Sequence, residues 1–142
     1  MEISLVPVGH VSRFLPQLMP HFYLSEKWTR GRAVIDDLLR FILNGQMQLW
    51  IGHDEAKVHG HYITEVKTYP QCKMLCVQYC AGNTGVLEQL EHKAFETLEK
   101  FAQDADCAGI EFIGRPGWRK AAQVHGFEVQ DVMYQKFFGE KP

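Results

Sequence analysis

Three cysteines spaced four residues apart, Cys72, Cys76 and Cys80, are the first candidates for chemistry in this sequence. On a helix, this spacing would stack three thiols on one face, as a metal or redox site requires. On a β-strand, the rise of ~3.3 Å per residue separates neighbouring members by about 13 Å. That is too far for thiolates that must each lie ~2.3 Å from one zinc ion. Val77 and Tyr79 favour a strand, so we expect a structural row of half-buried thiols on one face.

Two histidines, His59 and His61, flank Gly60 in a segment with the pattern of a strand. Residues two apart on a strand point the same way, so a metal ion shared with a third ligand such as His53 is one interpretation. The other interpretation is that these are ordinary histidines on an exposed sheet face. No pattern of carboxylates accompanies them, so we favour the second interpretation and expect no metal site.

The turn Gly82-Asn83-Thr84-Gly85 lies between a predicted strand and the longest predicted helix. Backbone N–H groups and the positive end of a helix dipole can bind a phosphate at such a junction, whereas glycines can also simply turn the chain. No Lys or Arg lies between residues 74 and 92, and Glu88 and Glu91 already complement the helix dipole. A phosphate site and a plain turn therefore both stay open.

Residues 114–119, Gly-Arg-Pro-Gly-Trp-Arg, form the most unusual stretch of the chain. Pro116 suits the first turn of a helix, and Trp118 is more typical of a core anchor than of a ligand contact. Arg115 follows the end of a strand at a helix start. It is either a solvated residue there or an anion-binding group beside the Gly82 turn.

Hydrophobic periodicity predicts the elements that must position these residues. A first helix carries the apolar repeat of residues 11–22 with Ser12 as its cap, and a second spans 34–42 and ends at Asn44-Gly45. The other predicted elements are strands at 2–8, 46–53, 57–69, 72–80 and 108–113, helices at 84–104 and 115–124, and one or two last strands at 128–138. The order is β-α-α-β-β-β-α-β-α-β(-β). It predicts an α/β fold with a mixed, partly antiparallel sheet and helices on both faces.

Length and composition limit the class of protein. The 142 residues suit one domain, and 46% apolar with 23% charged residues is typical of a globular protein. Fifteen Lys and Arg against 17 Asp and Glu give a net charge of −2, which argues against nucleic acid as a partner. No apolar run approaches the ~18 residues of a membrane span, and residues 1–5 do not resemble a signal peptide. We therefore expect a cytoplasmic protein with free thiols and no membrane partner.

The element order, the glycine turn before the long helix, and His125-Gly126-Phe127 after the last helix resemble the GNAT N-acetyltransferase superfamily over almost the whole chain. Several stretches resemble GNAT-like proteins encoded by tailed bacteriophages still more closely. These are Asn44-Gly45-Gln46-Met47-Gln48-Leu49-Trp50, Ile63-Thr64-Glu65-Val66 with Tyr69-Pro70, and Gly114-Arg115-Pro116-Gly117-Trp118 with Gly126-Phe127. The resemblance implies a single GNAT-like domain, 1–142, that works in a host cytoplasm or in a virion.

The resemblance also implies an acetyl-CoA site in an opening between the fourth and fifth strands. The pantetheine would lie along the fourth strand and the pyrophosphate on the turn after it, with a backbone N–H near Val77 polarising the thioester carbonyl. The predicted cofactor-binding residues are Val77, Gln78, Tyr79, Gly82, Asn83, Thr84, Gly85, Val86 and Arg115. Glu65 and Tyr79 are the candidate catalytic residues, because they lie on central strands near this opening.

Three positions depart from the pattern of the superfamily. Residues 79–84 keep one glycine of the phosphate loop and lack its basic first residue, and Ala122 stands where many members carry a proton-donating tyrosine. Arg115 replaces an asparagine that often begins the last helix.

Two functions follow from this pattern. One is the transfer of an acetyl group from acetyl-CoA to an unknown primary amine or protein acceptor; the other is a catalytically inactive phage protein that acts as a virion component or binds a host protein. Trp28, Arg30 and Arg32 are either an acceptor entrance or surface residues, and a late strand within 132–138 is a candidate for pairing with a second copy in a homodimer.

Overall fold

Five strands form one mixed sheet in the computed structural model, which describes residues 1–55 and 57–142. The strands are β1 (Glu2–Leu5), β2 (Met47–Asp54), β3 (Lys57–Thr68), β4 (Lys73–Gly82) and β5 (Gly109–Phe112), and they lie in that order across the sheet. Neighbours pair antiparallel from β1 to β4, whereas β4 and β5 pair parallel. The predicted α/β fold with a mixed, partly antiparallel sheet is confirmed.

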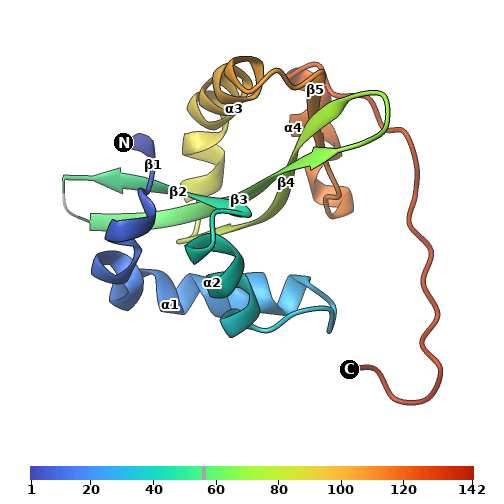
Figure 1. Ribbon diagram of the computed structural model, residues 1–142, viewed down its shortest axis with the longest axis horizontal. Helices are drawn as coiled ribbons and strands as arrows, with labels where there is room; N and C mark the ends of the chain where they lie inside the picture. Colours follow the sequence, from blue (N-terminus) through green and yellow to red (C-terminus); the bar gives the residue numbers. More distant parts are fainter. Residues whose placement is uncertain (56) are drawn as a thin grey trace.

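Helices cover both faces of this sheet (Figure 1). On one face lie α1 (Val11–Trp28), which follows the short 3-10 turn η1 (Val8–His10), and α2 (Ile35–Leu43). The other face carries α3 (Val86–Asp104), and η2 (Pro116–Trp118) with α4 (Arg119–Val124) follows β5. No helix within the described residues is both long and apolar enough to cross a bilayer.

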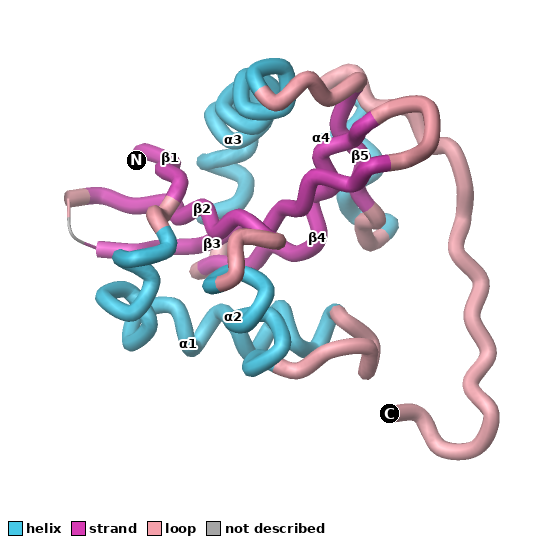
Figure 2. The backbone as a smooth tube through the Cα atoms, viewed as in Figure 1, coloured by secondary structure: helices cyan, strands magenta, loops and turns pink. Residues whose placement is uncertain are grey.

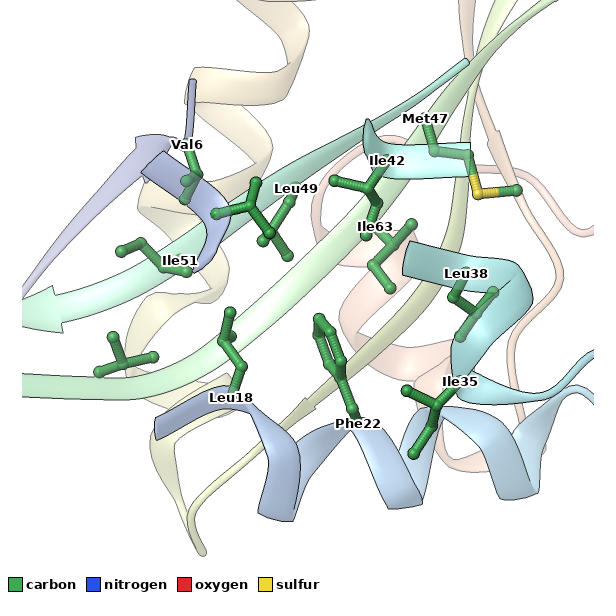
Figure 3. Close-up of a cluster of buried hydrophobic side chains, with 12 residues drawn as sticks. Val6, Leu18, Phe22, Ile35, Leu38, Ile42, Met47, Leu49, Ile51 and Ile63 are labelled. Carbon is green, nitrogen blue, oxygen red and sulfur yellow. The ribbon is translucent and has the colours of Figure 1, made fainter. Parts of the chain in front are cut away.

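Each face has its own buried cluster. Under α1 and α2, side chains such as Leu18, Phe22 and Leu38 pack on Leu49 and Ile63 of the central strands (Figure 3). Under α3, the cluster comprises Trp50, Tyr62, Leu75, Ala94, Leu98 and Ala102. The sheet is thus covered on both faces, as its apolar central strands require.

Local signals explain where α2 begins and ends. The Asp37 carboxylate accepts the Val34 N–H at 3.1 Å, which satisfies one of the free donors at the start of α2. At its end, Gly45 adopts a φ of +82°, the left-handed conformation that glycine allows. The stop predicted at Asn44-Gly45 is confirmed. The first helix, by contrast, begins at Val11 and not after a Ser12 cap.

A β-bulge at Gln78 alters the pattern of side chains along β4. The β3 partner of Tyr79 is Ile63 and that of Val77 is Thr64, so Gln78 has no partner in the register. One extra residue moves the following side chains to the opposite face. Val77 accordingly packs in the cluster under α3, whereas Tyr79 packs in the cluster under α1 and α2.

The bulge makes the predicted row of thiols wrong. Cys80 packs with Leu75 under α3, and Cys76, which neighbours Leu75 on the same strand, points to the other face. Cys72 precedes the strand and is exposed. Each thiol therefore has its own surroundings, and burial raises the pKa of both Cys76 and Cys80 to about 11.

The last strands expected at 128–138 are not formed. After α4 the chain runs as an extended loop to the C-terminus, clear of the sheet (Figure 2). Residues 128–136 are all exposed, and no ladder joins them to β5. β-branched and aromatic residues favour a strand, but a strand forms only where an edge receives it, and here the edge of β5 stays free.

Candidate functional site

The neighbouring strands β4 and β5 separate part-way along β4. Their parallel ladder runs from Met74 opposite Gly109 to Val77 opposite Phe112 and ends there, because β5 ends. β4 continues to Gly82 and, among the residues that the structure describes, pairs there with β3 alone. The backbone groups of residues 78–82 that face β5 are therefore left without a ladder partner.

The bulge places Gln78 beside Glu65 at the start of this opening. The Gln78 Nε2 donates to Glu65 Oε2 at 3.0 Å, and the Gln46 Nε2 lies 3.5 Å from the other carboxylate oxygen. Glu65 is half-buried and opposite Cys76, on the face covered by α1 and α2. One of the two predicted catalytic residues thus lies next to the predicted cofactor-binding residue Gln78.

Tyr79, the other candidate catalytic residue, lies on the same face. Burial raises the pKa of its hydroxyl, the charges of Cys76 and Glu65 add to this, and the nearby Arg32 guanidinium opposes it. A phenol with a raised pKa stays protonated at neutral pH, so Tyr79 suits the role of a proton donor better than that of a base.

The turn before α3 presents free backbone donors. Within the described chain, the Asn83 N–H donates to the His59 carbonyl at 2.9 Å and the Val86 N–H to the Asn83 carbonyl at 3.0 Å. The N–H groups with no acceptor among the described residues are those of Thr84, Gly85, Leu87 and Glu88. Free N–H groups at the start of a 19-residue helix suit an anion.

Gly82 has a packing role in this turn. It pairs with Gly60 of β3, and a Cβ on Gly82 would lie 3.0 Å from the His59 carbonyl oxygen and 3.1 Å from the Gly60 Cα. Close approach of two backbones therefore requires glycine here. Gly85, by contrast, has a φ of +79° and open space around it.

Two histidines connect α1 to the turn and to the strand before it, His21 through Asn83 of the turn and His61 of β3 through Ser25. His21 Nε2 lies 2.9 Å from the Oδ1 of Asn83, and Ser25 Oγ lies 2.7 Å from the Nε2 of His61. His61 is fully buried, and this burial, with a smaller effect of His21, lowers its pKa to about 3. The Asn83 side chain is thus engaged by the protein and anchors the turn to α1.

The three histidines considered as metal ligands have three separate partners. His61 bonds to Ser25, His53 Nε2 lies 2.8 Å from the Ser4 hydroxyl, and His59 Nε2 lies 3.3 Å from an Asp54 carboxylate oxygen. Across residues 1–55 and 57–142, no three metal-binding side chains come together.

Two arginines from distant segments reach the unpaired half of β4. The Arg115 guanidinium lies 4.0 Å from the centre of the Trp28 ring at the end of α1, and its charge partly offsets the burial that raises the pKa of Cys80. Arg32, from the loop between α1 and α2, acts in the same way on Tyr79. They act on opposite faces of the strand, because Cys80 packs under α3 and Tyr79 under α1 and α2. Sequence reasoning considered Arg115 beside the Gly82 turn and Arg32 with Trp28 and Arg30, and did not predict their effect on these two side chains of β4.

Two other positions bear on the site. Ala122, which stands where a tyrosine was considered, is buried, and its carbonyl accepts the Phe127 N–H at 2.9 Å. The structure also contains a cavity of about 220 Å³ lined by Ser4, Leu5, His10, Phe14, Ile51 and His53. This cavity lies by β1, at the opposite edge of the sheet from β5, and is separate from the opening.

Comparison with solved structures identifies the fold. A ribosomal-protein-alanine N-acetyltransferase from Brucella melitensis biovar Abortus 2308 matches with a TM-score of 0.70 at 14% identity, over 97% of this chain and 100% of its own. An aminoglycoside acetyltransferase from an uncultured soil metagenomic sample, solved with sisomicin, matches at 0.70 and 12% identity, over 99% and 96%. The chain has the GNAT fold. No family model and no curated protein sequence matches it.

A third GNAT-fold neighbour bears on the opening. It is a predicted acetyltransferase from Clostridium acetobutylicum solved with acetyl-CoA, which matches with a TM-score of 0.70 at 11% identity, over 96% of this chain and 95% of its own. All three neighbours extend over nearly the whole chain, so the likeness is one of overall fold.

Proposed function

We propose that this protein is an N-acetyltransferase that moves the acetyl group of acetyl-CoA to a primary amine by direct attack. The observation that carries the proposal is the separation of β4 from β5 after Val77, with a bulge at Gln78 and free N–H groups in the turn beyond. In the transfer, the amine nitrogen forms a bond to the thioester carbonyl carbon. The C–S bond breaks, the amine loses a proton, and the thiolate gains one.

The donor would lie along the opened edge of β4. Its pantetheine would pair with the backbone of Val77, Gln78 and Tyr79, and an N–H near Val77 would stabilise the developing oxyanion. The pyrophosphate would accept the N–H groups of Thr84 and Gly85, which have no acceptor within the described chain. A neighbour solved with acetyl-CoA supports this choice of donor.

Two side chains would move the protons. The Glu65 carboxylate, held by the amide of Gln78, would accept a proton from the amine, and the Tyr79 hydroxyl would protonate the thiolate. Both lie on the face of the sheet that α1 and α2 cover. The acceptor amine would therefore approach from that face, past Arg32.

The test is titration calorimetry with acetyl-CoA on the full chain, on Thr84→Glu and on Thr84→Gln. Thr84 is exposed, so both variants should fold. A carboxylate beside the pyrophosphate should weaken binding at least tenfold, a change of about 1.4 kcal/mol, whereas the neutral glutamine of equal size should have little effect. No heat at millimolar acetyl-CoA, or equal affinity of the two variants, would contradict the proposal.

A second candidate is a GNAT-shaped phage protein without catalysis, acting as a virion component or binding a host protein. Ala122, which offers no hydroxyl, favours it, as do the stretches that resemble phage-encoded proteins. Detection of the protein in purified particles together with no turnover of acetyl-CoA would support this candidate. Turnover with a defined amine in a host cytoplasm would support the enzyme.

A further inference from the structure

The C-terminal arm, defined as residues 128–138, exposes many apolar side chains. Five of its eleven residues are large, apolar and solvent-exposed: Val129, Val132, Met133, Tyr134 and Phe138. Tyr134 and Phe138 are 90% and 91% exposed. Large apolar side chains that gather along one exposed segment mark an interaction site, so the arm is expected to be covered by a partner.

The outer edge of β5 is a matching surface. β5 is the last strand of the sheet, and nothing among the described residues pairs with its outer side. Two more uncovered apolar side chains follow it, Ile113 directly after the strand and Val124 at the end of α4, at 74% and 79% exposure. An edge of this kind, with unpaired N–H and C=O groups, recruits another strand.

The arm does not lie along the β5 edge of its own chain. It starts after Phe127, whose ring packs 5.1 Å from that of Phe112 at the C-terminal end of β5. Further along, the Arg32 guanidinium donates to the Gln135 side chain at 3.2 Å, which holds that part of the arm at the loop between α1 and α2. Between these two contacts the arm runs clear of the sheet, along one side of the molecule (Figure 1).

The arm also lacks a turn with which to fold back on itself. Residues 128–138 contain no Gly, Pro or Asn, and the first such residue is Gly139. Fully extended, the arm spans about 36 Å, whereas the four residues of β5 span about 13 Å. One uninterrupted strand of that length exceeds the edge of a single β5.

We infer that the arm of each molecule adds as a β-strand to the β5 edge of a second copy, which forms a two-fold dimer. The exchange is reciprocal, so the same patch serves both molecules and the assembly closes. Backbone pairing to β5 provides affinity, and the apolar side chains of the arm cover Ile113 of the partner. The length of the arm beyond β5 then lies at the two-fold axis, where the two arms meet.

The first measurement is sedimentation equilibrium of the full chain over a range of concentrations, with an expected mass of twice 16.4 kDa. Met133→Asp should weaken the dimer at least tenfold by placing a charge in the covered strand. Leu43→Asp is the matched control, because Leu43 is similarly exposed but lies at the end of α2. A monomeric full chain, or equal effects of the two substitutions, would overturn the inference.

Amide hydrogen exchange at low and high protein concentration identifies the surface involved. Protection of residues 128–138 should rise as the dimer forms and should stay low in Met133→Asp. Protection that is independent of concentration would mean that the arm occupies its own β5. A dimer with an unprotected arm would mean that another surface joins the copies. Either result overturns the inference.

Discussion

The two halves of β4 differ in their neighbours and therefore in what they contribute. Residues 73–77 lie between β3 and β5, and Leu75 at their centre is fully buried. Residues 78–82 keep only β3, begin with a bulge, and include the half-exposed Gln78 and Tyr79. One strand thus provides both a core and the opened edge of a candidate site. The difference arises from where β5 ends and from one extra residue.

Truncation of Leu75 should give the largest effect on stability. Leu75→Ala removes a side chain that is fully buried under α3 and leaves a cavity, at a cost of roughly 2–5 kcal/mol. Gln78→Ala removes one hydrogen bond to Glu65 in the opened half, at a cost of roughly 0.5–1.5 kcal/mol. Urea unfolding followed by circular dichroism measures both. Equal losses would mean that the two halves are equally important to the core.

The elements around the first half of β4, and their order, could be predicted from the sequence. Alternating apolar residues and the turns at Asp54-Glu55 and Tyr69-Pro70 predicted the meander of β2, β3 and β4, and the apolar stripe from Leu87 to Phe101 predicted α3. These signals are local, because burial on one face repeats with the period of the element. They therefore appear in a single sequence.

The features that distinguish the second half could not be predicted in this way. Nothing in the residue type of Gln78 marks a bulge, because a bulge is a mismatch between two strands. Arg32 comes near Tyr79, and Arg115 near Cys80, only through the tertiary fold. The strand expected at 128–138 failed for a related reason, since its pairing depends on an edge and not on its own pattern.

The second half of β4, residues 78–82, should also be the more sensitive to acid. Its residue Ala81 pairs with His61 of β3, whose side chain is buried. An unfolded chain binds a proton at His61 below about pH 6.5, whereas the folded chain does so only near a pKa of about 3. Acidification between these values favours unfolding, so this group's contribution to stability is full above pH 6.5. It should fall by up to about 1.4 kcal/mol per pH unit below it.

Urea unfolding between pH 7 and pH 5 measures this slope, above the range in which most carboxylates titrate. His61→Gln removes the titrating group and should flatten the slope, even if its stability at pH 7 is lower. His92→Gln is the matched control, because the His92 side chain is 83% exposed and lies on α3. A slope that persists in His61→Gln would assign the acid sensitivity to another group.

The smallest expected effect concerns the contact that joins the elements on either side of the opening. Trp28 ends α1, which packs on β4, and Arg115 follows β5, so their stack 4.0 Å apart links the two sides. A double-mutant cycle with Trp28→Leu and Arg115→Met should give a coupling of about 0.5–1 kcal/mol. Methionine keeps the apolar stem of Arg115 and removes the charge.

The control is a cycle of Arg40→Met with Trp28→Leu. It should be additive, because Arg40 stacks on Phe41 instead. Additivity in the Arg115 cycle would mean that the end of α1 and the loop after β5 are energetically independent, and that only the shared sheet holds the opening at its width.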